Sequence, residues 1–266
     1  CGVNVINTPG LIGGSMKLHE DFSTVSLDKI FESAISYAEE GFAVTPQIAK
    51  LWQESADKYK NLNRQEFNEF FKTFTRNGKA PRAGEVFSCK NLAETLREIR
   101  DTKGKSFYEG SLAEKISNEV KRLGGFLSAD DLKNFTPKYV EPISTNYRGL
   151  DIWEIPPNGH GISVLMALNI LNKMELKDRR DPATMHKIVE AIKLSLTDAK
   201  TFVADPDSME IKIKELLSEE YAENRRAEIK DYAIIPNSYA IKSSDTVYFA
   251  TADRYGNMVS MIQSNY

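Results

Sequence analysis

The stretch SSDTVYFATADRYGNMVSMIQSNY, residues 243–266, carries the pattern that decides the fold. Two runs rich in β-branched, aromatic and other apolar residues flank a turn sequence, Asp253-Arg254-Tyr255-Gly256-Asn257. A three-residue loop with Gly256 in the left-handed conformation is a favoured closure for two antiparallel strands. The pattern therefore predicts a β-hairpin in which Asp253 pairs with Asn257.

The same closure fixes the register of the two strands. Counting back from the turn places Thr246 opposite Ser264, and cross-strand partners share one face of the sheet. Both faces of the hairpin are largely apolar, which is typical of strands inside a sheet that is covered on both sides. Spacing alone favours an ordinary strand-starting threonine at position 246. The pairing of two hydroxyl residues depends on the turn type, because a slip of one residue would separate them.

Composition excludes several classes of function. The chain has 266 residues, with 35 Lys and Arg against 38 Asp and Glu, so no basic surface for nucleic acid is indicated. The longest apolar run, residues 162–171, is about half the length of a bilayer-spanning helix and predicts a buried helix. Cys1 and Cys89 allow one bridge or two free thiols, and they exclude a Cys-rich metal site.

The rest of the chain is predicted to be mainly helical. A short apolar strand and a Pro9-Gly10 turn open it, followed by a segment where Gly13-Gly14 allows close backbone approach. Apolar spacing and capping residues predict a helix in each of several later segments. In the first half of the chain these helices cover residues 26–41, begin at residue 46, cover residues 57–76 with one aromatic stripe, begin at residue 91 and cover residues 107–123. A short helix capped by Ser128 follows, and two more helices cover residues 183–203 and 215–229. A strand around residues 152–155 precedes the buried helix.

The loop Pro156-Pro157-Asn158-Gly159-His160-Gly161 joins that strand to the buried helix. A rigid beginning and a flexible end suit a loop that shapes a pocket, and an ordinary strand-to-helix connection explains the loop equally well. His160 is a weak candidate for a ligand or an acid-base group, because no metal-type partner lies near it in the sequence.

The segment DTVYFATADRYGNMVSMIQS resembles the autoprocessing junction of the γ-glutamyltransferase and cephalosporin-acylase family. Further segments resemble the large subunit of that family in the same order: NTPGLIGG, AEEGFAVTPQIA, FYEGSLAEKISNEVKRLGGFLSADDLKNF, VEPISTNYRGLDIWEIPPNGHGISVLMALNIL and ADPDS. The resemblance covers nearly the whole chain. It implies the four-layer αββα sandwich of N-terminal-nucleophile hydrolases, with residues 1–245 as a mainly helical large-subunit portion and residues 246–266 as the first hairpin of the small subunit, together part of one intertwined domain.

The resemblance also implies a chemistry. The precursor would cut itself between Asp245 and Thr246, and the new N-terminal Thr246 would be the nucleophile. A freed α-amine, with a pKa of about 8, is a base on the same residue, whereas the amide before cleavage is not. Ser264 matches a position that usually holds Thr and orients the nucleophile. No metal or organic cofactor is implied.

Two positions depart from the family pattern. Tyr266 stands where Asn commonly helps to hold the glutamyl α-amino group, and Val247-Tyr248 replaces a frequent Thr-His pair. Tyr266 is therefore the candidate substrate-binding residue. The expected substrate is a γ-glutamyl amide such as glutathione, and a glutaryl or cephalosporin-type acyl amide is the alternative. The segments that would supply a carboxylate-binding Arg and an oxyanion hole are expected before Cys1 or after Tyr266.

Two other functional hypotheses stay open. An N-terminal Cys1 followed by Gly2 is typical of some glutamine amidotransferases, which would make its thiol a nucleophile. A family member that never cuts itself would instead be a structural or binding protein. The expected partners are a small-molecule amide substrate and two subunits from one precursor, with a homodimer of precursors allowed. The two cysteines slightly favour the cytoplasm, and a periplasmic or secreted location stays open.

Overall fold

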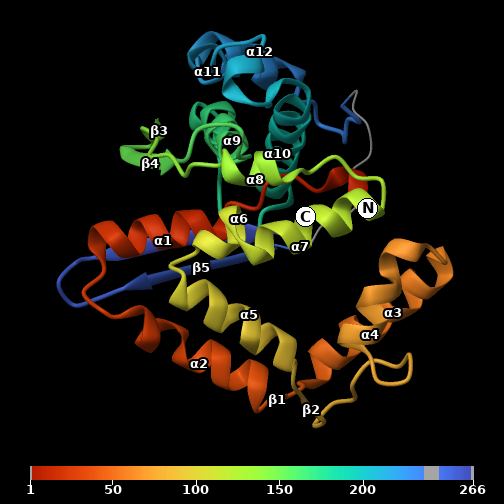
Figure 1. Cartoon of the computed structure of the whole chain (residues 1–266). Coiled ribbons are helices and arrows are strands. Elements are labelled where there is room, and N and C mark those ends of the chain that lie inside the picture. The colour runs from red at the N-terminus through yellow and green to blue at the C-terminus, as the bar shows by residue number, and fades with distance from the viewer. Residues whose placement is uncertain (1, 237–245, 265–266) are drawn as a thin grey trace. The chain divides into compact units, whose positions relative to one another are not determined.

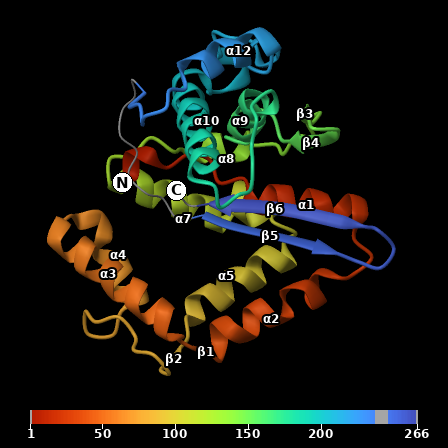
Figure 2. The same ribbon diagram turned by 180° about the vertical axis from the view of Figure 1, so that it is seen from behind.

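The computed structural model describes residues 2–236 and 246–264, and of Thr246 it describes the backbone alone. The chain divides into two compact units, residues 1–138 and 139–266. Figure 1 labels the helices and strands, and Figure 2 shows them from behind. Each unit is described by itself below.

The first unit is helical with one short strand pair. Its elements are η1 (Val3–Val5), α1 (Leu11–Phe22), α2 (Leu27–Glu39), β1 (Phe42–Ala43), α3 (Pro46–Leu62), η2 (Gln65–Phe67), α4 (Asn68–Phe74), β2 (Val86–Phe87), α5 (Lys90–Asp101), α6 (Lys105–Glu109), α7 (Ser111–Arg122) and α8 (Ala129–Lys133). Helices α2 and α5 lie side by side in both views, with Ile35, Ala38 and Ala93 buried between them.

Several sequence predictions for this unit are confirmed. Ser26 caps α2 by accepting a hydrogen bond from the Lys29 amide at 3.4 Å, and Ser128 forms a complete capping box with Asp131. The close approach at Gly13 is also present, because a Cβ there would lie 2.8 Å from the Phe135 ring. The Gly13 amide donates to the Tyr108 hydroxyl at 2.9 Å. No comparable neighbour lies within 4 Å of Gly14.

Three predictions for the first unit are wrong. Residues 3–5 form a 3-10 turn, in which the Ile6 amide donates to the Val3 carbonyl. The helix predicted over residues 57–76 is interrupted, since Asn63 adopts a left-handed conformation that ends α3. The aromatic stripe then folds back, with Phe67 stacked on Tyr59 at 4.6 Å between ring centroids. Gly110, in an extended conformation, likewise divides the predicted helix 107–123 into α6 and α7.

The second unit contains two hairpins and a helical core. Its elements are β3 (Ile143–Tyr147), β4 (Leu150–Glu154), α9 (Ile162–Asn172), α10 (Pro182–Phe202), η3 (Pro206–Ser208), α11 (Ile213–Leu216), α12 (Glu219–Glu228), β5 (Thr246–Ala252) and β6 (Met258–Ser264). The helix predicted over 215–229 is wrong at its start, because the Ser218 hydroxyl accepts from the Tyr221 amide and begins α12 as a new helix.

Helix α9 is the centre of the second unit, as its apolar run predicts. Ile162, Leu165, Met166 and Ile170 are all at most 1 % exposed. Helix α10 lies beside α9 in both views, and Leu194 and Ala191 pack against its end. Burial on this scale stabilises the helix by about 1.5–3 kcal/mol for each large apolar side chain. None of the described helices is both long and apolar enough to cross a membrane.

The C-terminal hairpin has the predicted turn and register. The Asp253 amide donates to the Asn257 carbonyl at 3.0 Å, and Gly256 has a φ of 85°. Position 246 pairs with position 264, and this is the seventh pair counted from the turn. In the described part of the chain all strands pair in twos. Both faces of the β5–β6 hairpin are largely exposed among the described residues. That other parts of the whole protein cover these two faces therefore stays a prediction.

Candidate active site

The candidate nucleophile position lies at the end of the hairpin away from the turn. Thr246 begins β5, and its backbone pairs with Ser264, the last residue of β6. The sequence argument for two hydroxyl residues on one face is therefore confirmed at the level of register. Asp245 and Tyr266, predicted as the processing site and a substrate-binding residue, lie outside the described residues.

A groove of about 770 Å³ opens in the second unit. We call it the strand-loop groove, because the end of β4, the following loop and the hairpin line it: Pro142, Trp153, Glu154, Ile155, Pro156, Asn158, Gly159, His160, Gly161, Val164, Tyr248, Ser260 and Ile262. A concave and mostly apolar site with a few polar groups is the usual form of a small-molecule site.

The hairpin presents one particular face to the groove. Its three lining residues, Tyr248, Ser260 and Ile262, occupy alternate positions along their strands. Positions 246 and 264 belong to the same alternate set, because residues two apart share a face. The Tyr248 and Ser260 hydroxyls lie 3.1 Å apart on this face. The candidate nucleophile position thus belongs to the face that lines the groove.

The turn that sets this register is held by Asp253. Its carboxylate accepts hydrogen bonds from the backbone amides of Tyr255 and Asn257, at 2.8 and 3.0 Å, and from the Asn257 side chain at 2.9 Å. These bonds, chiefly that from the Asn257 side chain, lower the pKa of Asp253 below its ordinary value. An aspartate at this position therefore fixes the turn in its ionised form.

The opposite wall of the groove is fixed by the start of α9. The His160 carbonyl accepts hydrogen bonds from the Ser163 amide at 3.0 Å and from the Ser163 hydroxyl at 2.7 Å. Glu154, at the end of β4, lies against Gly161, where a Cβ would overlap its carboxylate. The end of β4 therefore brings one acidic group into the groove.

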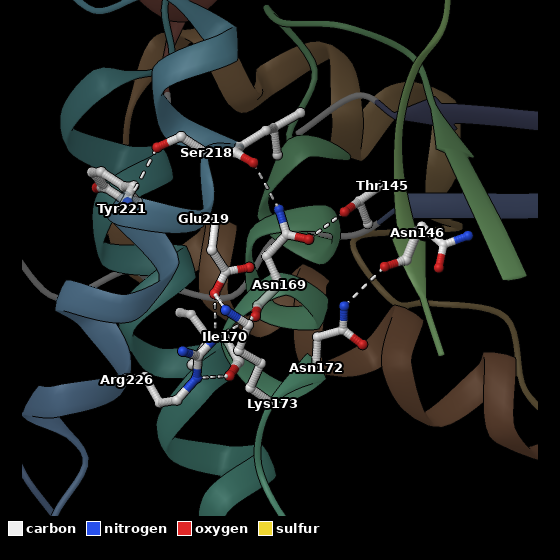
Figure 3. Close-up of polar contacts among 11 residues, drawn as sticks. Thr145, Asn146, Asn169, Ile170, Asn172, Lys173, Ser218, Glu219, Tyr221 and Arg226 are labelled. Carbon is white, nitrogen blue, oxygen red and sulfur yellow. Dashed lines mark hydrogen bonds and ion pairs between the residues drawn. The ribbon is translucent and has the colours of Figure 1, made fainter. Parts of the chain in front are cut away.

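Polar contacts hold the other end of α9, as Figure 3 shows. The Asn169 side chain donates to the Leu217 carbonyl at 3.1 Å and accepts from the Thr145 hydroxyl. The Asn172 side chain donates to the Asn146 carbonyl at 3.0 Å. These bonds tie α9 to β3 and to the segment before α12.

Arg226 of α12 completes this arrangement (Figure 3). Its Nε donates to the Ile170 carbonyl at 2.8 Å, and one Nη donates to the Asn169 carbonyl at 3.1 Å. Glu219 pairs with Arg226 at 3.3 Å and with Lys173 at 2.8 Å. Cations at a helix C-terminus satisfy its last carbonyls and complement the helix dipole. The network therefore positions α9, and with it the groove wall.

A buried ion pair lies away from the groove. Arg225 donates to both oxygens of Asp198, at 2.9 and 2.5 Å, and Asp198 is only 2 % exposed. Burial and the neighbouring Asp198 carboxylate raise the pKa of the Tyr221 phenol to about 12. Because none of these residues lines the groove, the pair is a structural feature of the α10–α12 contact.

The remaining candidates from the sequence do not form a second site. His160 lines the strand-loop groove, and the described residues contain no group of His, Cys, Asp and Glu that could hold a metal ion. Cys89 is a free cysteine in the first unit. Cys1, the nucleophile of the amidotransferase hypothesis, lies outside the described residues.

Sequence reasoning missed Trp153 and Glu154 as lining residues. Trp153 is 59 % exposed although it belongs to a strand rich in apolar residues. A Trp directly before a Pro-Gly loop was the available signal, and the hairpin residues that complete the groove, Tyr248, Ser260 and Ile262, are far away in the sequence.

Known proteins with similar sequences show the family of this chain. The family model for gamma-glutamyltranspeptidase matches residues 1–266. The glutathione hydrolase-like YwrD proenzyme of Bacillus subtilis is 33 % identical over 265 residues, which cover 99 % of this chain and 49 % of that protein. The chain spans about half the length of the curated relatives it matches.

Two solved structures share the fold. Cephalosporin acylase from Bacillus halodurans is 42 % identical with a TM-score of 0.88, covering 96 % of this chain and 47 % of that one. Helicobacter pylori gamma-glutamyltranspeptidase is 25 % identical with a TM-score of 0.77, covering 88 % and 67 %. The expected fold class, that of N-terminal-nucleophile hydrolases, is confirmed. The chain belongs to the gamma-glutamyltranspeptidase family.

Proposed function

We propose that the full-length protein is a self-cleaving amidohydrolase or acyltransferase of the γ-glutamyltransferase type. Cleavage between Asp245 and Thr246 divides it into a large subunit ending at residue 245 and a small subunit beginning at residue 246. The observation that carries this proposal is the pairing of position 246 with Ser264 on the hairpin face that lines the strand-loop groove.

The chemistry follows from an N-terminal Thr246. Its freed α-amine takes the proton of the hydroxyl, and the oxygen attacks the carbonyl carbon of an amide. The C–N bond then breaks, the amine leaves with that proton, and an ester between acyl group and Thr246 remains. Attack by water gives hydrolysis, and attack by a second amine gives transfer. The nucleophile and the base belong to one residue, so the mechanism requires no cofactor.

Ser264 is the positioning residue in this scheme. A hydroxyl directly across an antiparallel pair is within the range at which cross-strand Thr and Ser side chains interact. It orients the nucleophile before and after cleavage. Tyr266, two residues further along, remains the proposed contact for the acyl group.

Two acyl groups are candidates. A γ-glutamyl amide such as glutathione is supported by the family match over the whole chain. A glutaryl or cephalosporin-type acyl amide is the second candidate, and the 42 % identity to cephalosporin acylase from Bacillus halodurans favours it. The replacement of the family's usual Asn by Tyr266 removes one contact to a glutamyl α-amino group and points in the same direction.

The test uses the full-length protein. A denaturing gel after purification is expected to give two bands that divide at Thr246, and Thr246→Ala is expected to give one band and no turnover. Side-by-side assays with γ-glutamyl and glutaryl anilides decide between the acyl groups. One persistent band in the unmodified protein after long incubation would instead support the non-catalytic family member.

A further inference from the structure

We propose that the strand-loop groove binds the amine side of the amide substrate, and that it favours aromatic amines that carry a positive charge. This inference rests on the proposed function, because a nucleophile at position 246 divides an amide into an acyl side and an amine side. The amine side is both the leaving group in acylation and the acceptor in transfer.

Apolar surface in the groove fits an aromatic ring. Trp153 and Ile155, at and just after the end of β4, are each 59 % exposed, and Ile262 is an apolar residue that the hairpin contributes. All three line the same concave surface. Large apolar side chains that gather in a concavity indicate a ligand that covers them, since burying an aromatic ring there removes apolar area from water.

Charge in the groove excludes an acyl carboxylate as its occupant. Its lining includes Glu154 and no Lys or Arg among the described residues. A glutamyl or glutaryl carboxylate placed there would meet a like charge and no counterion. A cationic group would find an opposite charge, so the groove is complementary to the amine side of the substrate.

Glu154 is well placed to supply that charge. Its carboxylate lies against Gly161, the residue that directly precedes α9. Within residues 2–236 and 246–264, Glu154 has no ion-pair partner of its own. Its charge is therefore available to a ligand rather than consumed by a neighbouring Lys or Arg.

The hairpin wall adds an uncharged polar pair. The Tyr248 and Ser260 hydroxyls lie 3.1 Å apart on the face that lines the groove. Tyr248 is two residues after position 246, and Ser260 is four residues before Ser264. They offer one donor and one acceptor to the polar substituents of an amine. The groove thus combines an aromatic wall, one negative charge and a neutral hydroxyl pair.

The experiment varies the amine and holds the acyl group constant. Full-length processed protein is assayed with three amides of whichever acyl group it accepts: those of 4-(aminomethyl)aniline, 4-aminobenzoate and methylamine. All three give the same acyl-enzyme, so differences in kcat/KM report acylation and binding of the amine side. The expected kcat/KM is about fivefold higher for the cationic anilide than for the anionic one.

Two variants with matched controls test the groove. Trp153→Ala is expected to lower kcat/KM for both anilides about tenfold and to lower that for the methylamide much less, since methylamine carries no ring. Leu150→Ala is its control, because Leu150 lies on the same strand, is 67 % exposed and does not line the groove. Glu154→Gln is expected to bring the ratio of cationic to anionic anilide to about one. Glu223→Gln, an exposed carboxylate on α12, is its control.

The outcomes separate the inference from the proposed function. Absence of both self-cleavage and turnover in the unmodified protein would overturn the proposed function. Normal turnover with Trp153→Ala and Glu154→Gln indistinguishable from their controls would overturn the inference alone. If Trp153→Ala lowers the melting temperature more than Leu150→Ala does, Trp153→Phe replaces it, with an expected loss of about threefold for the anilides only.

Discussion

The Asp253 carboxylate accepts two hydrogen bonds from Asn257, one from the backbone amide at 3.0 Å and one from the side-chain amide at 2.9 Å. This contact closes the turn that places position 246 opposite Ser264. A residue at the turn therefore controls a pairing at the far end of two strands.

Asp253→Ala is expected to slow self-cleavage roughly threefold, because the turn loses three hydrogen bonds and the register becomes less strongly specified. The appearance of the small subunit on a timed denaturing gel measures it. Arg254→Ala is the control, since its guanidinium stacks on the neighbouring Tyr255 ring outside the ladder. Equal cleavage rates for the two variants would contradict the role of Asp253.

The turn is also expected to depend on pH. The pKa of Asp253 is lower in the folded turn than in the unfolded chain, so ionisation stabilises the fold. That contribution is complete above the unfolded pKa of about 3.9 and is lost as the pH falls through the folded pKa. Carboxyl NMR titration is expected to give a midpoint below 3.9, and Asn257→Ala is expected to raise it. An unchanged midpoint in that variant would refute the assigned cause.

Ser264→Ala is expected to slow both self-cleavage and turnover by about 10- to 100-fold, because a misoriented nucleophile reacts more slowly. Ser264→Thr is expected to retain activity, since it keeps the hydroxyl. Both rates are measured with the same anilide substrate. If Ser264→Thr were as slow as Ser264→Ala, the hydroxyl would not be the group that matters.

Gly13 and Gly14 form a matched pair for stability. Gly13→Ala is expected to destabilise the protein by about 1–3 kcal/mol, because the new Cβ would lie 2.8 Å from the Phe135 ring. Gly14→Ala is expected to stabilise it by about 0.5–1 kcal/mol, because the site is open and alanine favours a helix. Denaturant unfolding of both variants measures the difference, and the same sign for both would contradict it.

Arg226→Ala is expected to destabilise the second unit by about 1–3 kcal/mol, because the last carbonyls of α9 lose their donors. Arg179→Ala, at an exposed position before α10, is the control. Thermal unfolding compares the two, and we expect the loss in Arg226→Ala to be accompanied by weaker binding of anilide substrates. If Arg226→Ala lost less stability than Arg179→Ala, packing alone would hold α9 in place.

The sequence predicted those features that local chemistry determines. The register of β5–β6, the Ser128 cap and the buried α9 each follow from a turn, a cap or an apolar run within a few residues. The helix breaks at Asn63, Gly110 and Ser218 were missed, because the apolar spacing continues across them and only the backbone conformation or a competing cap reveals the interruption.

The groove could not be predicted for a different reason. Trp153 and Ile262 come from segments that are far apart in the sequence, and no periodicity within either segment predicts that both line one groove. The family resemblance supplied the position of the proposed nucleophile, and the pairing of Thr246 with Ser264 followed independently from the turn. Neither the family resemblance nor the turn predicted that Glu154 brings a negative charge into the groove.

The two strands of the C-terminal hairpin pair only with each other among the described residues. Each therefore presents an outer row of amide and carbonyl groups that further strands would normally satisfy. Exposed valine and phenylalanine side chains lie on the same two strands, so the hairpin has the features of a surface to which further β-strands bind.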